Sequence, residues 1–527
     1  MEGTIISLIP PLLALVMVVI TRRVLLSLGT GIIAGALVVS DFSPAGTVKK
    51  IYDSFAGTFV SDGALNTWNV YILLFLLLLG MMTAFISMAG GSRAFGEWAL
   101  KRVKTRAGAQ IVTAILGVLI FIDDYFNSLA VGQVSRPLTD RHGVSRAKLA
   151  YIIDSTSAPI CVVSPVSSWG AYIIALIGTV LATHSVTGYS AFSAFIAMIP
   201  MNIYVFISIL TVFAVAIFNL DFGAMKIHEK RALNEGQMTD PDRGKVPGEL
   251  KDDLPVSDKG TVGALVWPIV VLIIATVGSM VLTGRSAAIE AGTEVTILTI
   301  FENTDVAASL LYGGLIGLAA TIAFYVKTAG FSGSVFKTGI VEGIRSMLPA
   351  VYILVFAWSI VTIIDELGTG AYLAGLVEQS NMNVDFLPVA LFAVAGIMAF
   401  ATGTSWGTFG IMLPIAGEIA AASDITLLLP SLAAVLAGSV FGDHCSPISD
   451  TTILSSTGAG SHHIDHVITQ LPYAISSAVI SAIGFVVLGL TGSTWIALAV
   501  AIILLAAVVA VLKLSVGKSY REANESV

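Results

Sequence analysis

The chain has 527 residues, of which 56% are hydrophobic and only 12% charged, and its mean hydropathy is +0.91. Soluble globular domains carry roughly 25% charged residues, so this composition excludes an ordinary soluble protein. The net charge of −7 sits in the predicted loops, and we expect no nucleic-acid partner. Many apolar runs reach the roughly 20 residues that cross a bilayer, which predicts an all-α polytopic membrane protein embedded in lipid.

The first membrane half is predicted to cover residues 1–220. Residues 5–20 form an apolar run without a basic leader or a small-residue cleavage site, so we interpret it as a retained span and not as a signal peptide. Residues 24–39 return across the membrane, residues 42–59 lie along the interface, and residues 70–88 form the third span.

Two interrupted segments follow in this half. Residues 110–135 contain two short apolar runs around a polar tip and have basic residues on both flanks, which predicts a re-entrant hairpin. Residues 149–183 form a helix that we expect to break around 154–159, where Asp154 and Pro159 occur. Residues 221–260 are polar and rich in Pro and Gly, which predicts a cytoplasmic linker.

The second half, residues 261–514, repeats this plan. A second hairpin is predicted at residues 389–422 and a second broken helix at 427–457, and its polar stretch begins 289 residues after Asp154, at Asp443. Two matching broken helices in two halves are typical of secondary transporters with a site at mid-membrane depth. Residues 515–527 are predicted to form a cytoplasmic tail.

The distribution of basic residues predicts the topology. With about 11 transmembrane helices and the two hairpins, all but three of the 27 Lys and Arg residues fall on the cytoplasmic side; the exceptions are Lys49, Lys50 and Arg285. This arrangement places the N-terminus outside a cell (inner or plasma) membrane and the C-terminus in the cytoplasm. The two halves then become inverted repeats.

The predicted membrane interior is rich in acids and contains no Lys or Arg. Burying a charged carboxylate at this depth costs free energy unless it faces a water-filled cavity or a charged partner. A proton, Na+ or a cationic solute is therefore expected to occupy the space between the acids. The ionisable set is Asp123, Asp124, Asp154, Asp443, Asp450 and His444. The accompanying hydroxyls, which are hard oxygen ligands, are Ser155, Thr156, Ser157, Thr402, Thr404, Ser405, Ser446, Ser449 and Thr451.

Purely structural roles compete with this interpretation. Ser and Thr in spans commonly bond back to the preceding helical turn, and Asp123, Asp124 and Asp154 have the residue type of helix caps. Asn127 and Ser128 have the composition of residues that close a hairpin turn. His462, His463 and His466 suggest a solvated loop first, with a pH sensor or a metal site as alternatives.

Three motifs together resemble the NhaC family of sodium/proton antiporters. They are G-D-H-C-S-P-I-S-D-T-T from Gly442, F-I-D-D-Y-F-N-S from Phe121 and D-S-T-S-A-P-I from Asp154. The resemblance implies two inverted repeats, an elevator mechanism with scaffold and transport domains, and a homodimer. It implies an ion site formed by Asp123, Asp124, Asn127, Ser128, Asp154, Thr402, Gly403, Thr404, Ser405, Asp443, Ser446, Asp450 and Thr451. Na+ is expected at a subset of Asp123, Asp124, Asn127, Asp154, Thr404, Asp443 and Asp450.

Two functions remain open at this stage. The first is a Na+/H+ antiporter that exchanges cytoplasmic sodium for external protons by alternating access. The second is a Na+- or H+-coupled transporter of a small organic solute, either an amino acid or a hydroxy acid such as malate or lactate. A channel is less well supported, because two inverted repeats with broken helices suit alternating access and not a continuous pore. An enzyme is not expected, because no nucleophile–base pair stands out in the sequence. No cofactor is expected beyond the transported Na+ and H+.

Overall fold

A computed structural model describes residues 4–21, 23–61, 63–121, 123–165, 167–244, 246, 256–329, 333–369, 372, 375 and 383–525. The first-half helices are α1 (Ile9–Thr21), α2 (Val24–Val39), α3 (Pro44–Phe59), α4 (Thr67–Met88), α5 (Gly91–Arg102), α6 (Arg106–Leu119), α7 (Asp124–Arg141), α8 (Arg146–Val163), α9 (Ser168–Thr183), α10 (Ala191–Met198), α11 (Ile203–Phe218) and α12 (Ala224–Glu235). The later helices are α13 (Gly263–Glu290), α14 (Ile297–Glu302), α15 (Val306–Ala329), α16 (Gly333–Glu366), α18 (Leu387–Thr402), α19 (Ser405–Ser423), α20 (Leu428–His444), α21 (Asp450–Ala459), α22 (His463–Thr491) and α23 (Thr494–Glu525).

Within these ranges the only strands are the two-residue β1 (Val60–Ser61) and β2 (Ala64–Leu65), which pair in antiparallel fashion. Short 3-10 helices are η1 (Ile5–Leu8), η2 (Ile199–Met201), η3 (Pro241–Arg243), η4 (Val384–Phe386) and η5 (Ile425–Leu427). The polytopic all-α class is therefore confirmed.

Eight helices of the described chain are long and apolar enough to cross a membrane, and a ninth candidate is the bent pair of α10–η2 with α11. Four shorter apolar segments, in α1, α2, α6 and α9, lie below the length of a single span. The multi-pass character is thus supported, whereas a total of about 11 spans stays a prediction.

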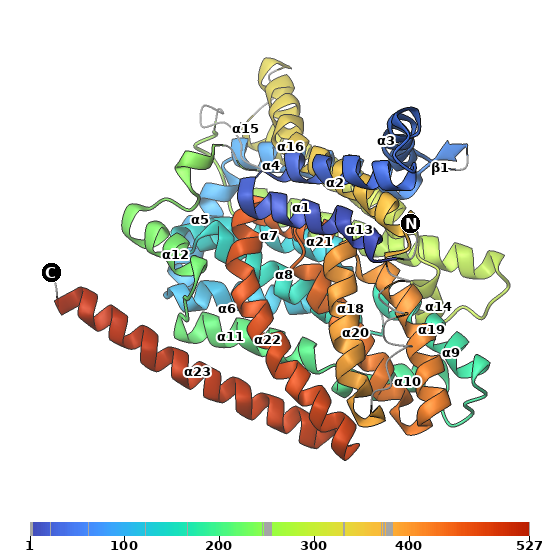
Figure 1. The fold of residues 1–527 in the computed structure, drawn as a ribbon. Coiled ribbons are helices and arrows are strands. Elements are labelled where there is room, and N and C mark those ends of the chain that lie inside the picture. The colour runs from blue at the N-terminus through green and yellow to red at the C-terminus, as the bar shows by residue number, and fades with distance from the viewer. Residues whose placement is uncertain are drawn as a thin grey trace.

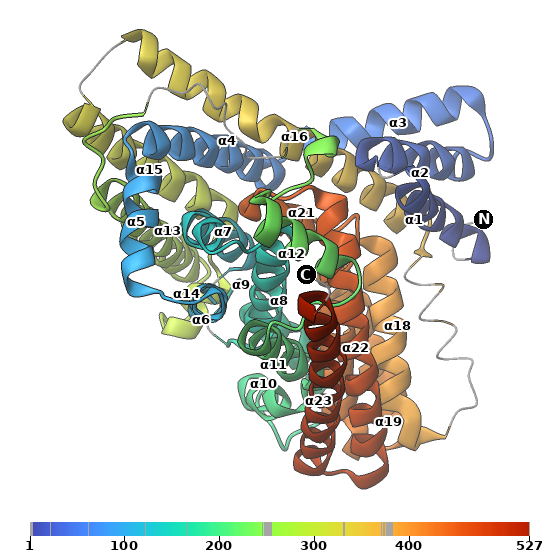
Figure 2. The ribbon, with the colours of Figure 1, turned by 90° about the vertical axis from the view of Figure 1, so that its left-hand side faces the viewer.

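The buried apolar side chains gather mainly in two clusters. One contains residues of α9, α18, α20 and α22, and the other contains residues of α2, α4 and α16. In Figures 1 and 2, α2, α4 and α16 lie in the upper part of the molecule, and α18, α22 and α23 run below them. Tyr125 of α7 and Leu454 of α21 belong to the second cluster, so these two helices pack on the side of α2, α4 and α16.

Two helix pairs fold back on themselves at the positions of the predicted hairpins. The first is α6 with α7, which are separated by a short connection that includes residues 120, 121 and 123, and the second is α18 with α19, joined by Gly403 and Thr404. Gly403 has φ +71°, and a Cβ there would lie 2.9 Å from the carbonyl oxygen of Ile448. This turn therefore requires glycine, because the backbone conformation and the close contact both exclude a side chain.

The first helix break lies farther along the chain than the sequence analysis expected. α8 runs without interruption through Asp154 and Pro159, ends at Val163, and continues as α9 from Ser168. Pro159 is thus accommodated inside a helix, which neighbouring helices can allow in membrane proteins. The break falls instead on Ser164-Pro165 and Ser167.

The second break, between α20 and α21, spans residues 445–449 and carries the related sequence S-P-I-S. In both breaks the last serine caps the helix that follows: Ser167 accepts from the amide of Gly170 at 2.9 Å, and Ser449 from that of Thr452 at 3.5 Å. Asp443 lies in the last turn of α20, directly before the second break, whereas Asp154 lies in the middle of α8, well before the first break. The two acids therefore do not occupy equivalent positions relative to the two breaks.

Candidate functional site

Asp443 ties the second hairpin to the second break. It lies in the last turn of α20 and is 1% exposed. Its Oδ2 accepts hydrogen bonds from the backbone amide (3.0 Å) and the hydroxyl (2.7 Å) of Ser405, at the start of α19. Its Oδ1 accepts from the Ser449 hydroxyl at 2.6 Å. The carboxylate is therefore surrounded by hydroxyl and amide donors.

Asp124 begins α7 at the tip of the first hairpin. Its Oδ1 accepts from the indole nitrogen of Trp169 at 2.8 Å, whereas its buried Oδ2 has no hydrogen-bond partner among the described residues. The carboxylates of Asp123, Asp443 and Asp450 are near enough to interact with it electrostatically. Leaving a buried carboxylate oxygen unpaired is costly, which indicates room for a cation or a proton.

Asp123 also has the capping role that the sequence left open. Its Oδ1 accepts from the amide of Phe126 at 2.9 Å, so it closes the N-terminus of α7. Behind it, the Asn127 amide nitrogen donates to the carbonyls of Gly117 and Ile120, at 2.6 Å each, and fixes the hairpin turn.

Asp450 faces a cavity of about 410 Å³. It is half-buried at the first position of α21 and accepts hydrogen bonds from the hydroxyl of Tyr125 and, at 3.4 Å, from the indole of Trp358. Gly403 and Thr404 of the second hairpin tip line the same cavity. Among the described residues, none that lines this cavity and none that donates a hydrogen bond to the side chain of Asp124, Asp443 or Asp450 in the contacts above is Lys or Arg.

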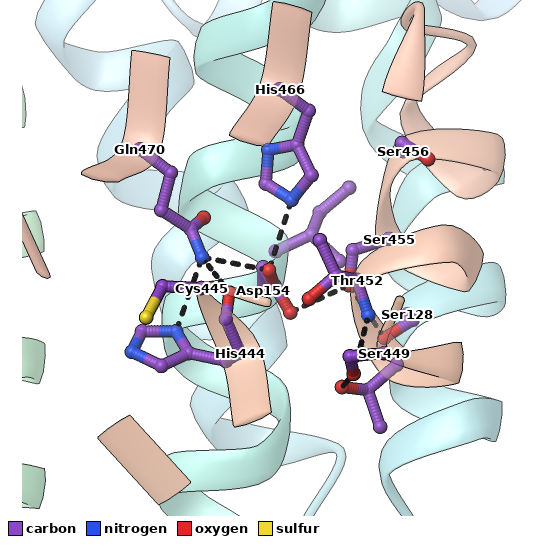
Figure 3. Close-up of polar contacts among 12 residues, drawn as sticks. Ser128, Asp154, His444, Cys445, Ser449, Thr452, Ser455, Ser456, His466 and Gln470 are labelled. Carbon is purple, nitrogen blue, oxygen red and sulfur yellow. Dashed lines mark hydrogen bonds and ion pairs between the residues drawn. The ribbon is translucent and has the colours of Figure 1, made fainter. Parts of the chain in front are cut away.

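Asp154 forms a second buried polar network, shown in Figure 3. It is fully buried in the middle of α8. Its Oδ2 lies 2.9 Å from Nε2 of His466 and 2.8 Å from the amide nitrogen of Gln470, and its Oδ1 accepts from Ser455 at 3.1 Å. The Ser455 hydroxyl lies 3.0 Å from that of Ser128, which connects this network to the first hairpin.

The network continues toward His444. The side-chain amide of Gln470 donates to the carbonyl of His444, and Nε2 of His444 lies 2.5 Å from the hydroxyl of Tyr204. The Asp154 network thus links α8, α11, α20, α21 and α22 through buried polar side chains, of which Asp154, His444 and His466 can carry protons.

The expected solvated loop at residues 462–466 is wrong for two of its histidines. His463 and His466 are 3% and 0% exposed because α22 begins at His463 and its first turn packs inside the protein. His463 lies 2.8 Å from the carbonyl of Pro447 and 3.2 Å from the hydroxyl of Ser456. No group of three or more His, Cys, Asp or Glu side chains in the described part of the chain could hold a metal ion.

The sequence predicted a solvated loop at His466, with a pH sensor as an alternative, and did not identify Gln470. The spacing of His463, His466 and Gln470, at i, i+3 and i+7 on an apolar helix, was the available signal that they share one buried face. Asp154, the hydrogen-bond partner of His466 and Gln470, lies more than 300 residues away, which no local pattern could identify.

Several predicted hydroxyl ligands bond to backbone carbonyls, as the structural alternative proposed. Thr156 donates to Ile152 at 2.8 Å, Ser157 to Asp154 at 3.3 Å and Thr402 to Met398 at 2.9 Å. Ser446 reaches across to Phe400 at 2.7 Å, and the Thr451 hydroxyl lies 2.9 Å from that of Ser449. The Ser155 hydroxyl and the Asn127 side-chain oxygen are buried and have no hydrogen-bond partner in the part of the chain described here.

Two basic residues that the sequence analysis assigned to the cytoplasmic side are buried. Lys148, near the start of α8, is 0% exposed and pairs with Asp221 and Glu229. Arg136 of α7 donates to the carbonyls of Thr457 and Gly458 at the end of α21. Both stand near helix ends, where carboxylates or free carbonyls compensate their charge.

Comparison with known proteins identifies the family. A sequence model of the Na+/H+ antiporter family matches residues 160–490. The chain belongs to the Na+/H+ antiporter family. The resemblance predicted from the three motifs is therefore confirmed, and the chain is a multi-pass membrane protein of an antiporter family.

Three similar proteins were found, and the name of one of them states what it transports. An uncharacterized protein of Haemophilus influenzae is 49% identical over 487 residues, covering 92% of this chain and 91% of its own. The malate-2H(+)/Na(+)-lactate antiporter of Bacillus subtilis is 36% identical over 170 residues, covering 30% of this chain and 34% of its own. The YdaH transporter of Alcanivorax borkumensis is a solved structure with 13% identity and a TM-score of 0.34, over 85% of this chain and 89% of its own.

Proposed function

We propose that the protein exchanges cytoplasmic Na+ for external protons by alternating access. The observation that carries this proposal is the acid group Asp124, Asp443 and Asp450, which lies beside both hairpin tips without a described basic partner and in which one oxygen of Asp124 is unpaired. Carboxylate and hydroxyl oxygens suit hard cations such as Na+. Buried acids without a fixed cation require a mobile one.

Competition at these carboxylates provides the coupling. A carboxylate that holds a proton has lost the charge that attracts Na+, and a carboxylate that holds Na+ resists protonation. Na+ and H+ therefore displace each other at the same oxygens. We assign the Na+ site to Asp124 and Asp443 with neighbouring hydroxyls, and a proton-carrying role to Asp154 with His466.

The architecture proposed for this exchange is an elevator. The two apolar clusters would be the transport and scaffold domains, and the helices that fold back at 120–123 and at Gly403 would be re-entrant hairpins of two inverted repeats. The proposed setting is the inner or plasma membrane, with the N-terminus outside, the C-terminus in the cytoplasm and a homodimer formed through the scaffold.

A second candidate function is ion-coupled exchange of a small organic solute. The size of the 410 Å³ cavity beside Asp450, though not its charge, favours an organic solute, because a bare ion needs far less space. The Bacillus subtilis relative is named as a malate/lactate antiporter, so its name states organic solutes as substrates of that protein. Amino acids and hydroxy acids are the solutes that this alternative includes.

Proteoliposomes that contain a pH-sensitive dye test the first function. A Na+ gradient imposed without any organic solute should drive proton movement through the wild-type protein, and Asp443→Asn should abolish it. Glu418→Gln, an exposed acid on the same hairpin, is the matched control and should behave as wild type. Strict dependence on an organic solute would reject the Na+/H+ proposal in favour of the second candidate.

A further inference from the structure

We propose that the cavity beside Asp450 binds a small organic ammonium ion, and that this ion is transported in competition with Na+. The inference rests on the proposed cation exchange and deepens it by naming a second class of substrate. Four observations carry it: the size of the cavity, its aromatic walls, its charge and its place between the two apolar clusters.

The cavity is too large for an ion alone. Its volume of about 410 Å³ lies within the range of pockets that hold small organic ligands, roughly 300 to 1,000 Å³. A Na+ ion bound by protein oxygens occupies a small fraction of such a space. The remaining volume therefore suits a solute with a carbon skeleton.

Aromatic side chains from four helices line this space. They are Trp68 of α4, Tyr125 of α7, Trp358 of α16 and Trp406 of α19. Aromatic rings are poor ligands for Na+, which prefers oxygen, but they attract organic cations through their π-electrons. Clusters of such rings are the usual means by which proteins recognise alkylated ammonium groups.

The rings are held in place by contacts of their own. Trp406 stacks on Tyr172, with the ring centroids 4.9 Å apart, and meets Trp169 edge-on at 5.8 Å. Trp68 and Tyr125 lie 6.5 Å apart, and Tyr125 and Trp358 both donate to Asp450. The aromatic wall is thus organised before any solute binds, which lowers the entropic cost of binding.

The charge of the lining selects a cation. Asp450 is the only charged residue among the described residues that line the cavity. An organic anion would meet this carboxylate without any Lys or Arg to compensate it, and a zwitterion would leave its own carboxylate unpaired. An ammonium ion instead pairs with Asp450 and places its alkyl groups against the rings.

The cavity lies where the two apolar clusters meet. Trp358 packs against the cluster of α2, α4 and α16, whereas Trp406 packs against the cluster of α18, α20 and α22. A movement of one cluster past the other would therefore separate these two walls. A solute held between them would be released, as alternating access requires.

Inhibition of Na+-driven proton exchange in proteoliposomes tests the proposal. The probes are methylammonium, tetramethylammonium, tetraethylammonium and choline, with malate, lactate and alanine as the anionic and zwitterionic comparison. At least one ammonium probe should inhibit wild-type exchange competitively with Na+, and its radiolabelled form should be taken up in exchange for protons that leave an acidic vesicle interior. The anions and alanine should have no effect.

Substitutions of cavity residues test whether the ammonium probes inhibit by binding in the cavity. Trp406→Leu and Trp68→Leu should each raise the inhibition constant of the ammonium probe about tenfold while Na+-driven exchange persists. Trp495→Leu, an exposed tryptophan on α23, is the control. If a leucine variant elutes as an aggregate, Trp406→Phe, which keeps an aromatic ring, should retain inhibition within a fewfold of wild type.

The outcomes separate this inference from the function on which it rests. If Na+-driven exchange proceeds and no ammonium probe inhibits it at millimolar concentration, or if only malate, lactate or alanine does so, the inference is overturned and the Na+/H+ proposal stands. If no exchange occurs without an organic solute but an ammonium probe is exchanged for protons, the inference stands and the Na+/H+ proposal fails.

Discussion

Nε2 of His466 lies 2.9 Å from Oδ2 of Asp154, although 312 residues separate them in the chain. Both side chains are fully buried, and Nδ1 of His466 has no hydrogen-bond partner within the described ranges. A buried acid in contact with an imidazole is a pair that can exchange a proton, and the contact joins α8 of the first half to α22 of the second.

This pair should act as a unit in transport. Asp154→Asn and His466→Gln should each slow Na+-driven proton movement and shift its pH optimum, and the double variant should be little worse than either single one. Such non-additivity corresponds to a coupling of about 0.5 to 3 kcal/mol between residues in contact. Initial rates in proteoliposomes across a pH series measure it, with the partly exposed His184→Gln as control. Strictly additive losses would show that the two residues act separately.

The contact between α7 and α21 should not tolerate a methyl group. A Cβ on Gly132 would lie 2.3 Å from the carbonyl oxygen of Gly458, and one on Gly458 would lie 2.2 Å from that of Ser128. Either glycine-to-alanine change should therefore push the helices apart and destabilise the protein by about 1 to 3 kcal/mol.

Thermal unfolding of the purified protein in detergent measures this loss. Gly278→Ala is the matched control, because no atom lies within 4 Å of its added Cβ in the middle of α13. It should leave the transition temperature unchanged or slightly raised. Equal behaviour of Gly132→Ala and Gly278→Ala would contradict the close approach of α7 and α21.

Lys148 should stabilise the N-terminal end of α8. Replacing it by methionine leaves the buried carboxylates of Asp221 and Glu229 without this partner, although Arg106 also lies near them. Removing one member of a buried ion pair costs about 3 to 5 kcal/mol, and the remaining arginine should place the loss toward the lower value. Lys230→Met, an exposed lysine of α12, should have little effect on the unfolding temperature. An unchanged transition for Lys148→Met would show that the pair is dispensable.

His228 should make helix α12 sensitive to acid. Burial, with Arg231 and Arg243 nearby, lowers the pKa of His228 to about 4 from its usual 6.5. Because the unfolded helix takes up a proton at a higher pH than the folded one, α12 should lose stability as pH falls from about 6.5 toward 4.

Hydrogen exchange of residues 224–235 at pH 7 and pH 5, corrected for intrinsic rates, measures this effect. Protection should fall at the lower pH in the wild-type protein and fall less in His228→Gln. The same fall in both proteins would assign the effect to other groups.

The sequence located the second break well because its signals are local. Between Gly442 and Thr452, one proline, two acids and several hydroxyls interrupt an apolar run, and few helices would continue through them. The prediction for the first break was wrong because Pro159 lies inside a helix, and the chain breaks instead at the related S-P-V-S sequence that begins at Ser164. Tertiary packing decided between two prolines that look alike in sequence.

The aromatic cavity and the Asp154 network depend on contacts between distant segments. Trp68 and Trp358 are unremarkable residues of apolar helices until the fold brings them beside Asp450. The burial of His466 likewise follows from the packing of α22 against α8, and a short polar sequence does not distinguish a buried first turn from a solvated loop.

The most direct test of the account is whether Na+ binding releases protons from the acids that surround Asp124. Na+ should be titrated calorimetrically into purified protein at mildly acidic pH, in buffers of different ionisation enthalpy, so that proton release is counted separately from binding. We predict that the wild-type protein and Glu418→Gln release protons as Na+ binds, and that Asp124→Asn and Asp443→Asn lose this linked release. Na+ binding without proton release, or equal release from Asp443→Asn, would contradict exchange at these carboxylates.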